Sequence, residues 1–143
     1  MATTRIANAH WEGSLMEGKG RVSLDSSKVG SFDVTWPSRA EQPEGRTSPE
    51  ELIAAAHSSC FSMALSHALA QAGSAPTALD TRAEVTFKPG TGITGIALTV
   101  RGRVPGMSAD DFEKAAQAAK EGCPVSQALA GTTISLDASL DES

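Results

Sequence analysis

Residues Ser48–Gly73, SPEELIAAAHSSCFSMALSHALAQAG, are the stretch that decides the fold of this chain. The pattern predicts one long helix. Ser48 suits the N-cap, Pro49 suits the first helical position, and Glu50 lies where the helix dipole favours negative charge. Gly73 supplies the left-handed residue at which helices commonly end. The rest of the chain is expected to pack around this central helix.

The predicted helix has an unusual surface. Between Glu51 and Gln71 it carries no charged residue, apart from whatever charge His57 and His67 hold. A helix without a solvated face is typically buried, so we expect this one to be buried. Much of its surface is Ala or Ser, which would let another backbone approach closely. Cys60 stands in its middle.

Length and composition indicate one globular domain over residues 1–143. Hydrophobic residues make up 40% of the sequence and charged residues 20%, which is typical of a folded domain. The net charge of -5 offers no basic footprint for nucleic acid or for an anionic membrane surface. We therefore expect neither of these partners.

The compartment is predicted from two further observations. His57 and several serines interrupt the apolar helix, so we expect no membrane span, and residues 1–6 lack the apolar stretch of a signal peptide. Both point to the cytoplasm. Two cysteines in that compartment are better explained as reduced core thiols, metal ligands or a redox pair than as a permanent disulfide.

Alternation and turn residues place the strands. Phe32, Val34 and Trp36, for example, alternate with polar neighbours as in a half-buried strand. We expect strands at 5–11, 20–25, 29–36, 81–88, 93–104 and 132–138, a polar loop at 37–47, a second helix at 108–122 and a short helix beginning at 123–124. The order βββ-α-ββ-α(α)-β segregates strands from helices. It predicts an α+β fold with antiparallel sheets packed around the long helix.

The cysteines allow three interpretations. Cys60 could be a small core residue, and Cys123, just before Pro124 at a helix start, lies where unpaired backbone N–H groups lower a thiol pKa. A metal site is a second possibility, because His57 and Cys60 are three residues apart and His67 is seven further on. The third is a redox couple in which Cys60 attacks and Cys123 resolves. Residue types by themselves leave these alternatives open.

Three stretches of the sequence resemble the osmotically inducible protein C family, the relatives of organic hydroperoxide resistance proteins. They are Arg39, residues 47–66 (TSPEELIAAAHSSCFSMALS) and residues 123–129 (CPVSQAL). With the order of elements, the likeness covers essentially the whole chain. Ser48 replaces the Asn usual in the family, but Ser also caps a helix. His57 fits the osmotically inducible branch, since the organic hydroperoxide resistance branch more often has Tyr there.

The resemblance implies an OsmC-like fold and a cytoplasmic thiol peroxidase acting as an intertwined homodimer. The implied substrates are organic hydroperoxides and, more weakly, hydrogen peroxide. By this likeness Cys60 is the peroxidatic cysteine, Cys123 the resolving cysteine, and Arg39 with Glu50 the polar support. No metal or bound cofactor is implied, and the reductant is an external dithiol, of the dihydrolipoamide type or on a lipoylated protein. The alternative function is a non-enzymatic thiol redox sensor or a small-molecule-binding protein.

The spacing of two of these residues also predicts a dimer. Glu50 and Cys60 are ten residues apart, which is about 15 Å along a continuous helix at 1.5 Å per residue. Glu50 of one chain therefore cannot support its own Cys60. Two such helices crossing antiparallel near residues 54–56 would place Glu50 of one chain opposite Cys60 of the other. We expect a twofold dimer with composite sites.

Overall fold

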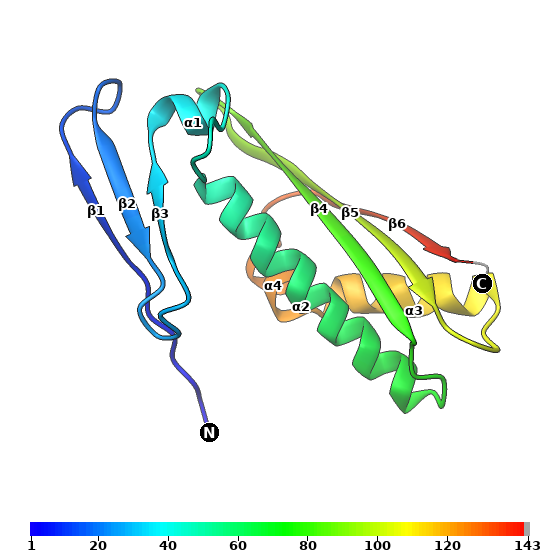
Figure 1. The fold of residues 1–143 in the computed structure, drawn as a ribbon. Coiled ribbons are helices and arrows are strands. Elements are labelled where there is room, and N and C mark those ends of the chain that lie inside the picture. The colour runs from blue at the N-terminus through cyan, green and yellow to red at the C-terminus, as the bar shows by residue number, and fades with distance from the viewer. Residues whose placement is uncertain (142–143) are drawn as a thin grey trace. The chain divides into compact units, whose positions relative to one another are not determined.

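A computed structural model describes residues 1–141 of the chain (Figure 1). The chain divides into two compact units, Met1–Leu52 and the part from Ile53 onward. The long helix α2 (Pro49–Gln71) begins in the first unit and continues through the second. Sheets, a long helix and shorter helices follow one another as the sequence predicts, and the α+β class is confirmed. The expected single domain over 1–143 stays a prediction.

The first unit contains a three-stranded antiparallel sheet in the order β1-β2-β3. The strands are β1 (Asn8–Glu12), β2 (Lys19–Ser23) and β3 (Ser31–Val34), close to the predicted positions, and each is shorter than its predicted range. Val22 pairs with Ala9 on one side and Phe32 on the other. Every residue of β1 is exposed, so this sheet has little core of its own.

A short helix, α1 (Trp36–Ala40), lies within the segment predicted to be a polar loop. That prediction was wrong because a capping box closes the start of the helix. The Thr35 hydroxyl accepts from the Ser38 N–H at 3.1 Å, and the Ser38 hydroxyl accepts from the Thr35 N–H at 3.0 Å. Pro37 in the first turn adds a second start signal. The helix places Arg39 in its last turn.

Both ends of α2 are confirmed. The Ser48 hydroxyl accepts a hydrogen bond from the Glu51 N–H at 3.1 Å, which caps the start. At the other end Gly73 adopts a φ of +88°, and the Ser74 N–H donates to the Leu69 carbonyl at 2.9 Å. These are the bonds that a left-handed glycine makes available to the last carbonyls of a helix.

The expectation that α2 is buried is wrong for the chain by itself. Phe61, Leu65 and Leu69 are fully buried, whereas the Met63 side of the helix is exposed, with Met63 at 71%. The physical reason is that, within the second unit, the sheet and α3 pack against one face of this helix. The uncovered face consists largely of small residues.

The length and composition of α2 contradict one premise of the expectation about membrane spans, namely that no helix is apolar enough, while the expectation itself stays a prediction. Within residues 1–141, α2 is the one helix long and apolar enough to cross a membrane, with a mean hydropathy of 1.2 over its best window. Its serines lower the hydropathy less than expected, because many alanines surround them. The packed Phe61, Leu65 and Leu69 show that the same composition also suits a core helix of a globular unit.

The second unit contains a three-stranded sheet in the order β4-β5-β6. β4 (Ala78–Lys88) and β5 (Gly92–Arg103) form the predicted antiparallel hairpin, with Gly90 at a φ of +86° in the turn. β6 (Ile134–Leu140) pairs parallel with β5, so this sheet is mixed rather than antiparallel. The helices between β5 and β6 form the crossover connection that a parallel neighbour requires.

Helices α2 and α3 (Ala109–Gly122) cover the same face of this sheet (Figure 1). Ser108 caps α3 as predicted, accepting from the Asp111 N–H. The short helix α4 (Pro124–Ala128) follows directly, with Cys123 at its N-cap position. One apolar cluster joins these elements, and its fully or nearly buried members are Phe61, Leu65, Leu69, Leu98, Val100, Val104, Phe112, Ala116, Ala119 and Cys123. Cys123 thus sits at the edge of the core where α2 and α4 meet.

Candidate redox site

The two cysteines meet within the second unit. Cys60 comes from the middle of α2 and Cys123 from the start of α4, and their Sγ atoms lie 3.0 Å apart in a shared hydrogen bond. Both thiols are free. Cys60 is half-buried, whereas Cys123 is fully buried. A small oxidant can therefore approach Cys60 from solvent more readily than Cys123.

The surroundings act differently on the two thiols. Burial and the neighbouring Cys123 raise the pKa of Cys60, and the backbone N–H of Val125 offsets this only in part. Burial also raises the pKa of Cys123, but the hydrogen bond with Cys60, the N–H groups of Ser126 and Val125 and the Ser126 hydroxyl outweigh it, leaving this pKa below its ordinary value. The Cys123 thiol makes no cap bond of standard geometry, yet it lies near enough to these donors for the expected helix-start effect.

A second polar pair lies beside the thiols. His57 is on α2 and Ser126 on α4, and Nε2 of His57 lies 2.7 Å from Oγ of Ser126. His57 is fully buried and Ser126 nearly so. Burial lowers the pKa of His57, so its ring is neutral near pH 7. The sequence reasoning missed Ser126, although its three-residue spacing from Cys123 matches that of His57 from Cys60.

The residues proposed for a metal site do not come together. Nε2 of His57 is occupied by Ser126, and His67 is exposed on α2. Within residues 1–141, no three His, Cys, Asp or Glu side chains gather as a possible metal site.

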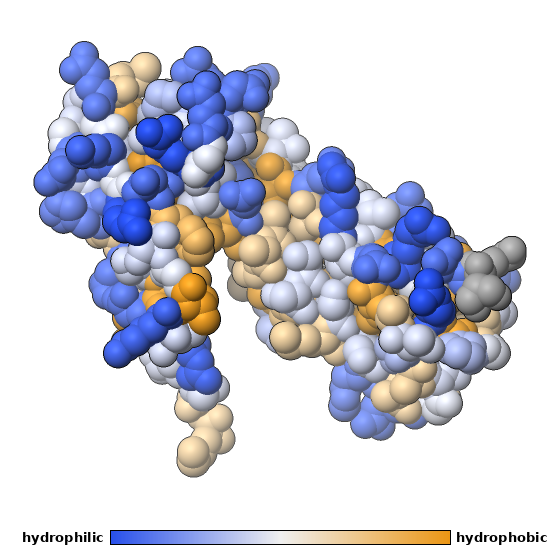
Figure 2. Space-filling model, viewed as in Figure 1, coloured by the Kyte–Doolittle hydropathy of each residue, from blue (hydrophilic) through white to orange (hydrophobic). Residues whose placement is uncertain are grey.

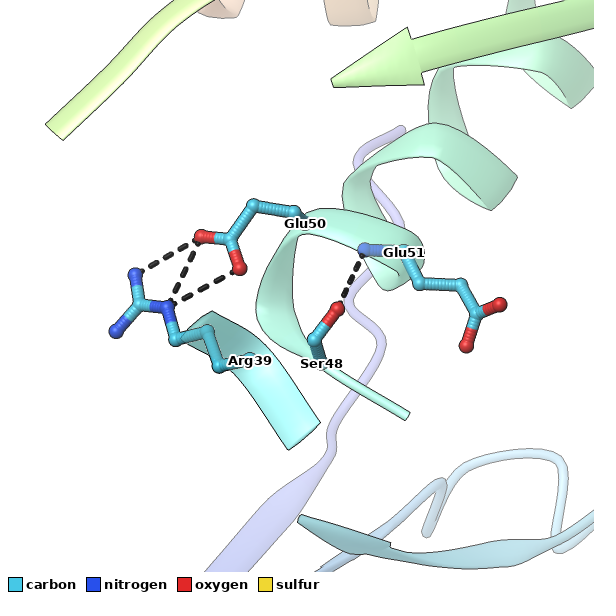
Figure 3. A network of polar contacts seen from close by, with 4 residues as sticks. All are labelled: Arg39, Ser48, Glu50 and Glu51. Atoms are coloured by element: carbon cyan, nitrogen blue, oxygen red, sulfur yellow. Dashed lines mark hydrogen bonds and ion pairs between the residues drawn. The ribbon is translucent and has the colours of Figure 1, made fainter. Parts of the chain in front are cut away.

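Arg39 and Glu50 form a bidentate ion pair within the first unit (Figure 3). Nε of Arg39 lies 3.1 Å from both carboxylate oxygens of Glu50, and Nη2 lies 2.9 Å from Oε2. The Glu50 side chain is only 8% exposed, so its charge needs this partner. Glu51 points away and accepts from the Thr47 hydroxyl instead. The two residues expected to form the polar support therefore pair with each other, while their role in chemistry stays a prediction.

The four predicted site residues thus form two pairs, each inside one unit. Arg46, the other arginine of this segment, is exposed, as expected for a surface charge.

Comparison with known proteins identifies the family. The family profile described as "OsmC-like protein" matches residues 42–137. The chain belongs to the OsmC family. It is 46% identical over 132 residues to the protein named peroxiredoxin OsmC from Escherichia coli (strain K12), covering 90% of this chain and 92% of that protein.

More distant members are also similar. The organic hydroperoxide resistance protein OhrA of Bacillus subtilis (strain 168) is 29% identical over 122 residues, covering 82% of this chain and 86% of that protein. The higher identity to peroxiredoxin OsmC agrees with the predicted OsmC-like branch. The crystal structure of the organic hydroperoxide resistance protein OhrB of Bacillus subtilis superimposes with a TM-score of 0.71 at 24% identity, covering 95% of this chain and 98% of that one. This OsmC-family chain thus shares its fold with that organic hydroperoxide resistance protein.

Proposed function

We propose that the protein is a thiol-dependent peroxidase that reduces organic hydroperoxides, and hydrogen peroxide more weakly, through Cys60 and Cys123. The observation that carries the proposal is the approach of two free thiols to 3.0 Å, one half-exposed and the other buried behind it. The names of the relatives, peroxiredoxin OsmC and organic hydroperoxide resistance protein, support a redox role of the peroxidase type.

In the proposed cycle, the Cys60 thiolate attacks one peroxide oxygen. The O–O bond breaks, the alcohol leaves with a proton, and Cys60 becomes a sulfenic acid. Cys123 then attacks the Cys60 sulfur, forming a disulfide and releasing water. Condensation competes with further oxidation to the irreversible sulfinic acid, so a nearby second thiol protects the enzyme. An external dithiol reduces the disulfide, and no bound cofactor or metal takes part.

Arg39 would supply the positive charge that stabilises the Cys60 thiolate. Its bidentate bond with Glu50 fixes the guanidinium in one orientation, which a point-like ammonium could not reproduce. Because Glu50 and Cys60 are ten residues apart on the continuous helix α2, we propose that this support comes from a second copy of the chain. The proposed enzyme is then an intertwined homodimer with composite sites.

Exposed apolar surface supports the dimer. Figure 2 shows hydrophobic residues reaching the surface of the chain. Large examples are Ile6, Trp11, Leu15, Met16, Val29, Phe32 and Met63, with exposures from 38% to 76%. Trp11 and Phe32 come from the sheet of the first unit, which has little core of its own. Such surface typically marks an interface.

The compartment and the reductant are part of the same proposal. A cytoplasmic location supplies the reducing conditions in which the two thiols stay free between turnovers. A dithiol of the dihydrolipoamide type suits the half-exposed Cys60, because its second thiol completes the exchange before the mixed disulfide can reoxidise.

A peroxidase assay tests the function. Purified protein is given tert-butyl hydroperoxide or hydrogen peroxide, with dihydrolipoamide or a monothiol as reductant, and peroxide loss is followed over many turnovers. We expect faster loss of the organic peroxide and a strong preference for the dithiol. Cys60→Ser should abolish turnover. Cys123→Ser should allow at most one turnover and then leave sulfinic acid on Cys60.

Two results would contradict the proposed peroxidase function. Oxidation of both cysteines without multiple turnovers in the presence of any dithiol would favour the redox sensor. Turnover that survives Cys60→Ser would exclude Cys60 as the peroxidatic residue.

A further inference from the structure

Two pairs of contacting side chains join α2 to the start of α4. The first is the thiol pair, Cys60 with Cys123, at 3.0 Å, and the second is His57 with Ser126, at 2.7 Å. In each helix the two contributing residues are three apart, so they lie on one face. The Ser126 hydroxyl, which contacts the His57 ring, therefore lies on the same side of this segment as the Cys123 thiol, which contacts Cys60.

The state of the His57 ring decides what the Ser126 hydroxyl can do. Nδ1 of His57 is buried without a hydrogen-bond partner in the described part of the chain, and the ring is neutral. A neutral imidazole has one N–H donor and one acceptor nitrogen. If Nε2 carries the hydrogen, it donates to Ser126 Oγ, and the single proton of the hydroxyl remains free for another acceptor. If Nε2 is the acceptor, the hydroxyl donates its single proton to Nε2 and has none left for another acceptor.

The available acceptor is the sulfur of Cys123. The N–H groups of Ser126 and Val125 and the hydroxyl of Ser126 lower the pKa of this thiol, although neither N–H group makes a cap bond to its sulfur in the structure. A thiolate there could accept hydrogen bonds from all three donors. Because the site is buried, each of these bonds would be stronger than in water. Protonation of His57 at Nε2 and donation from Ser126 to sulfur are therefore mutually consistent.

We propose that His57 is a positioning residue for disulfide formation: its Nε2–H holds the Ser126 hydroxyl so that the hydroxyl proton points at the sulfur of Cys123. The proposal rests on the peroxidase function proposed above. It assigns His57 and Ser126 to the resolving cysteine, not to the first reaction with peroxide.

The step balances without a further reactant. Cys123 gives up its thiol proton, and its sulfur attacks the sulfenic sulfur of Cys60. The S–S bond forms, the S–O bond breaks, and the departing hydroxide takes up a proton to become water. Cys123 is oxidised and the Cys60 sulfur is reduced by the same amount. The hydroxyl of Ser126 stabilises the thiolate before the attack.

The proposed hydrogen bond from the Ser126 hydroxyl to the Cys123 sulfur also acts when the disulfide is reduced. When the dithiol attacks Cys60, the S–S bond breaks and Cys123 leaves as a thiolate. A leaving thiol of lower pKa leaves faster. His57 and Ser126 thereby assist both the formation and the reduction of the disulfide.

Other titratable groups near Cys123 are few among the described residues. Cys60 on α2 contacts it directly, and His57 reaches it through Ser126. On α3, which ends one residue before it, Lys120 donates to the Ile134 carbonyl at 3.3 Å and Glu121 is exposed. None of the groups shifting the Cys123 pKa lies on α3.

The test measures the pKa of the Cys123 thiol in the full-length Cys60→Ser protein, by thiolate absorbance and alkylation rate against pH. In that background we expect Ser126→Ala and His57→Leu each to raise the pKa by about one unit, the worth of one hydrogen bond to a charged group. His57→Gln, which restores an N–H donor, should return the pKa most of the way. Because no peroxide is used, this result is independent of the peroxidase proposal.

A second measurement concerns turnover in the protein with both cysteines. With excess tert-butyl hydroperoxide and a dithiol, Ser126→Ala should raise the fraction of Cys60 sulfinic acid several-fold per turnover, measured by mass spectrometry. The rate of Cys60 sulfenic acid formation, measured in the Cys123→Ser protein, should not change. The first readout moves only if resolution is slowed.

Ser62→Ala is the matched structural control. Ser62 also lies on α2 and makes a side-chain bond of 2.7 Å, to Thr81 of β4, away from the α4 contact. It should leave the Cys123 pKa unchanged. An unchanged pKa in both Ser126→Ala and His57→Leu, or a shift of equal size in Ser62→Ala, would overturn the proposal. If His57→Leu does not fold, Ser126→Ala and the His57→Gln comparison decide.

Discussion

At the scale of single residues, the guanidinium group of Arg39 makes three hydrogen-bond contacts with the carboxylate of Glu50. Lysine keeps the charge but cannot make two parallel bonds. We expect Arg39→Lys to lower kcat/KM for tert-butyl hydroperoxide by about ten- to a hundredfold, the range for charge-assisted bonds.

Arg46→Lys is the control for that substitution, because Arg46 is an exposed arginine of the same segment. Its kcat/KM should stay within twofold of wild type. If Arg46→Lys were the slow variant and Arg39→Lys were not, the supporting cation would have to be reassigned.

His57 gives a stability prediction at the same scale. Burial lowers its pKa from the ordinary value of 6.5, so just below pH 6.5 the unfolded chain binds more protons than the folded chain. The free energy of unfolding is therefore fully retained above pH 6.5 and falls as the pH decreases through that value. When the free energy of unfolding is measured with urea between about pH 5 and 7.5, it should depend less steeply on pH in His57→Gln than in the wild type.

The exposed His67, on the same helix, provides the comparison for that experiment. His67→Gln should keep the wild-type dependence on pH. If the free energy of unfolding changed equally with pH in the wild type and in His57→Gln, His57 would not be held neutral by burial.

At the scale of elements, the contact between β5 and α3 depends on the absence of a side chain at Gly102. A Cβ there would lie 2.6 Å from the ring of Phe112 and 3.2 Å from Leu79. Phe112 is 1% exposed and cannot swing into solvent. We expect Gly102→Ala to lower the free energy of unfolding by about 1 to 3 kcal/mol, the usual cost of overpacking a core. Urea denaturation measures it.

Gly122 is the matched position, since a Cβ there meets nothing within 4 Å. It ends α3, where alanine favours the helix over glycine. Gly122→Ala should therefore be neutral or slightly stabilising. Equal destabilisation in the two variants would show that close packing at Gly102 is not the cause.

The elements also show what local sequence can predict. The ends of α2 were predictable because Ser48 and Gly73 make their bonds within one turn of chain. The parallel direction of β6 was not, because it depends on how the α3 and α4 crossover returns to the sheet. Helix α1 carried a readable signal in Thr35 and Ser38, which the polar composition of the segment obscured.

At the scale of the whole molecule, the candidate site was predictable only in part. Cys60 and Cys123 are 63 residues apart, and no local pattern pairs them, so their roles came from family resemblance. Arg39 and Glu50 are likewise eleven apart, across a turn. The pair of His57 and Ser126 forms only when α4 docks on α2, so the matching three-residue spacings in the two segments could not by themselves pair these residues.

The proposed composite site gives the last prediction, which is tested by subunit complementation. Arg39→Ala and Cys60→Ser are each expected to be inactive. When equal amounts are unfolded and refolded together, half of the dimers should be mixed. In each mixed dimer, the Cys60 of one chain meets the Arg39 of the other and restores one of two sites. Random pairing therefore predicts about a quarter of wild-type peroxidase activity.

Mixing Cys60→Ser with Cys123→Ser is the control, because the structure brings these two cysteines together within one chain. That mixture should show no gain over its separate homodimers. If Arg39 instead served the Cys60 of its own chain, the Arg39→Ala and Cys60→Ser mixture would also stay inactive. Because the ten-residue spacing on a continuous helix favours support from the partner, we expect recovery near a quarter.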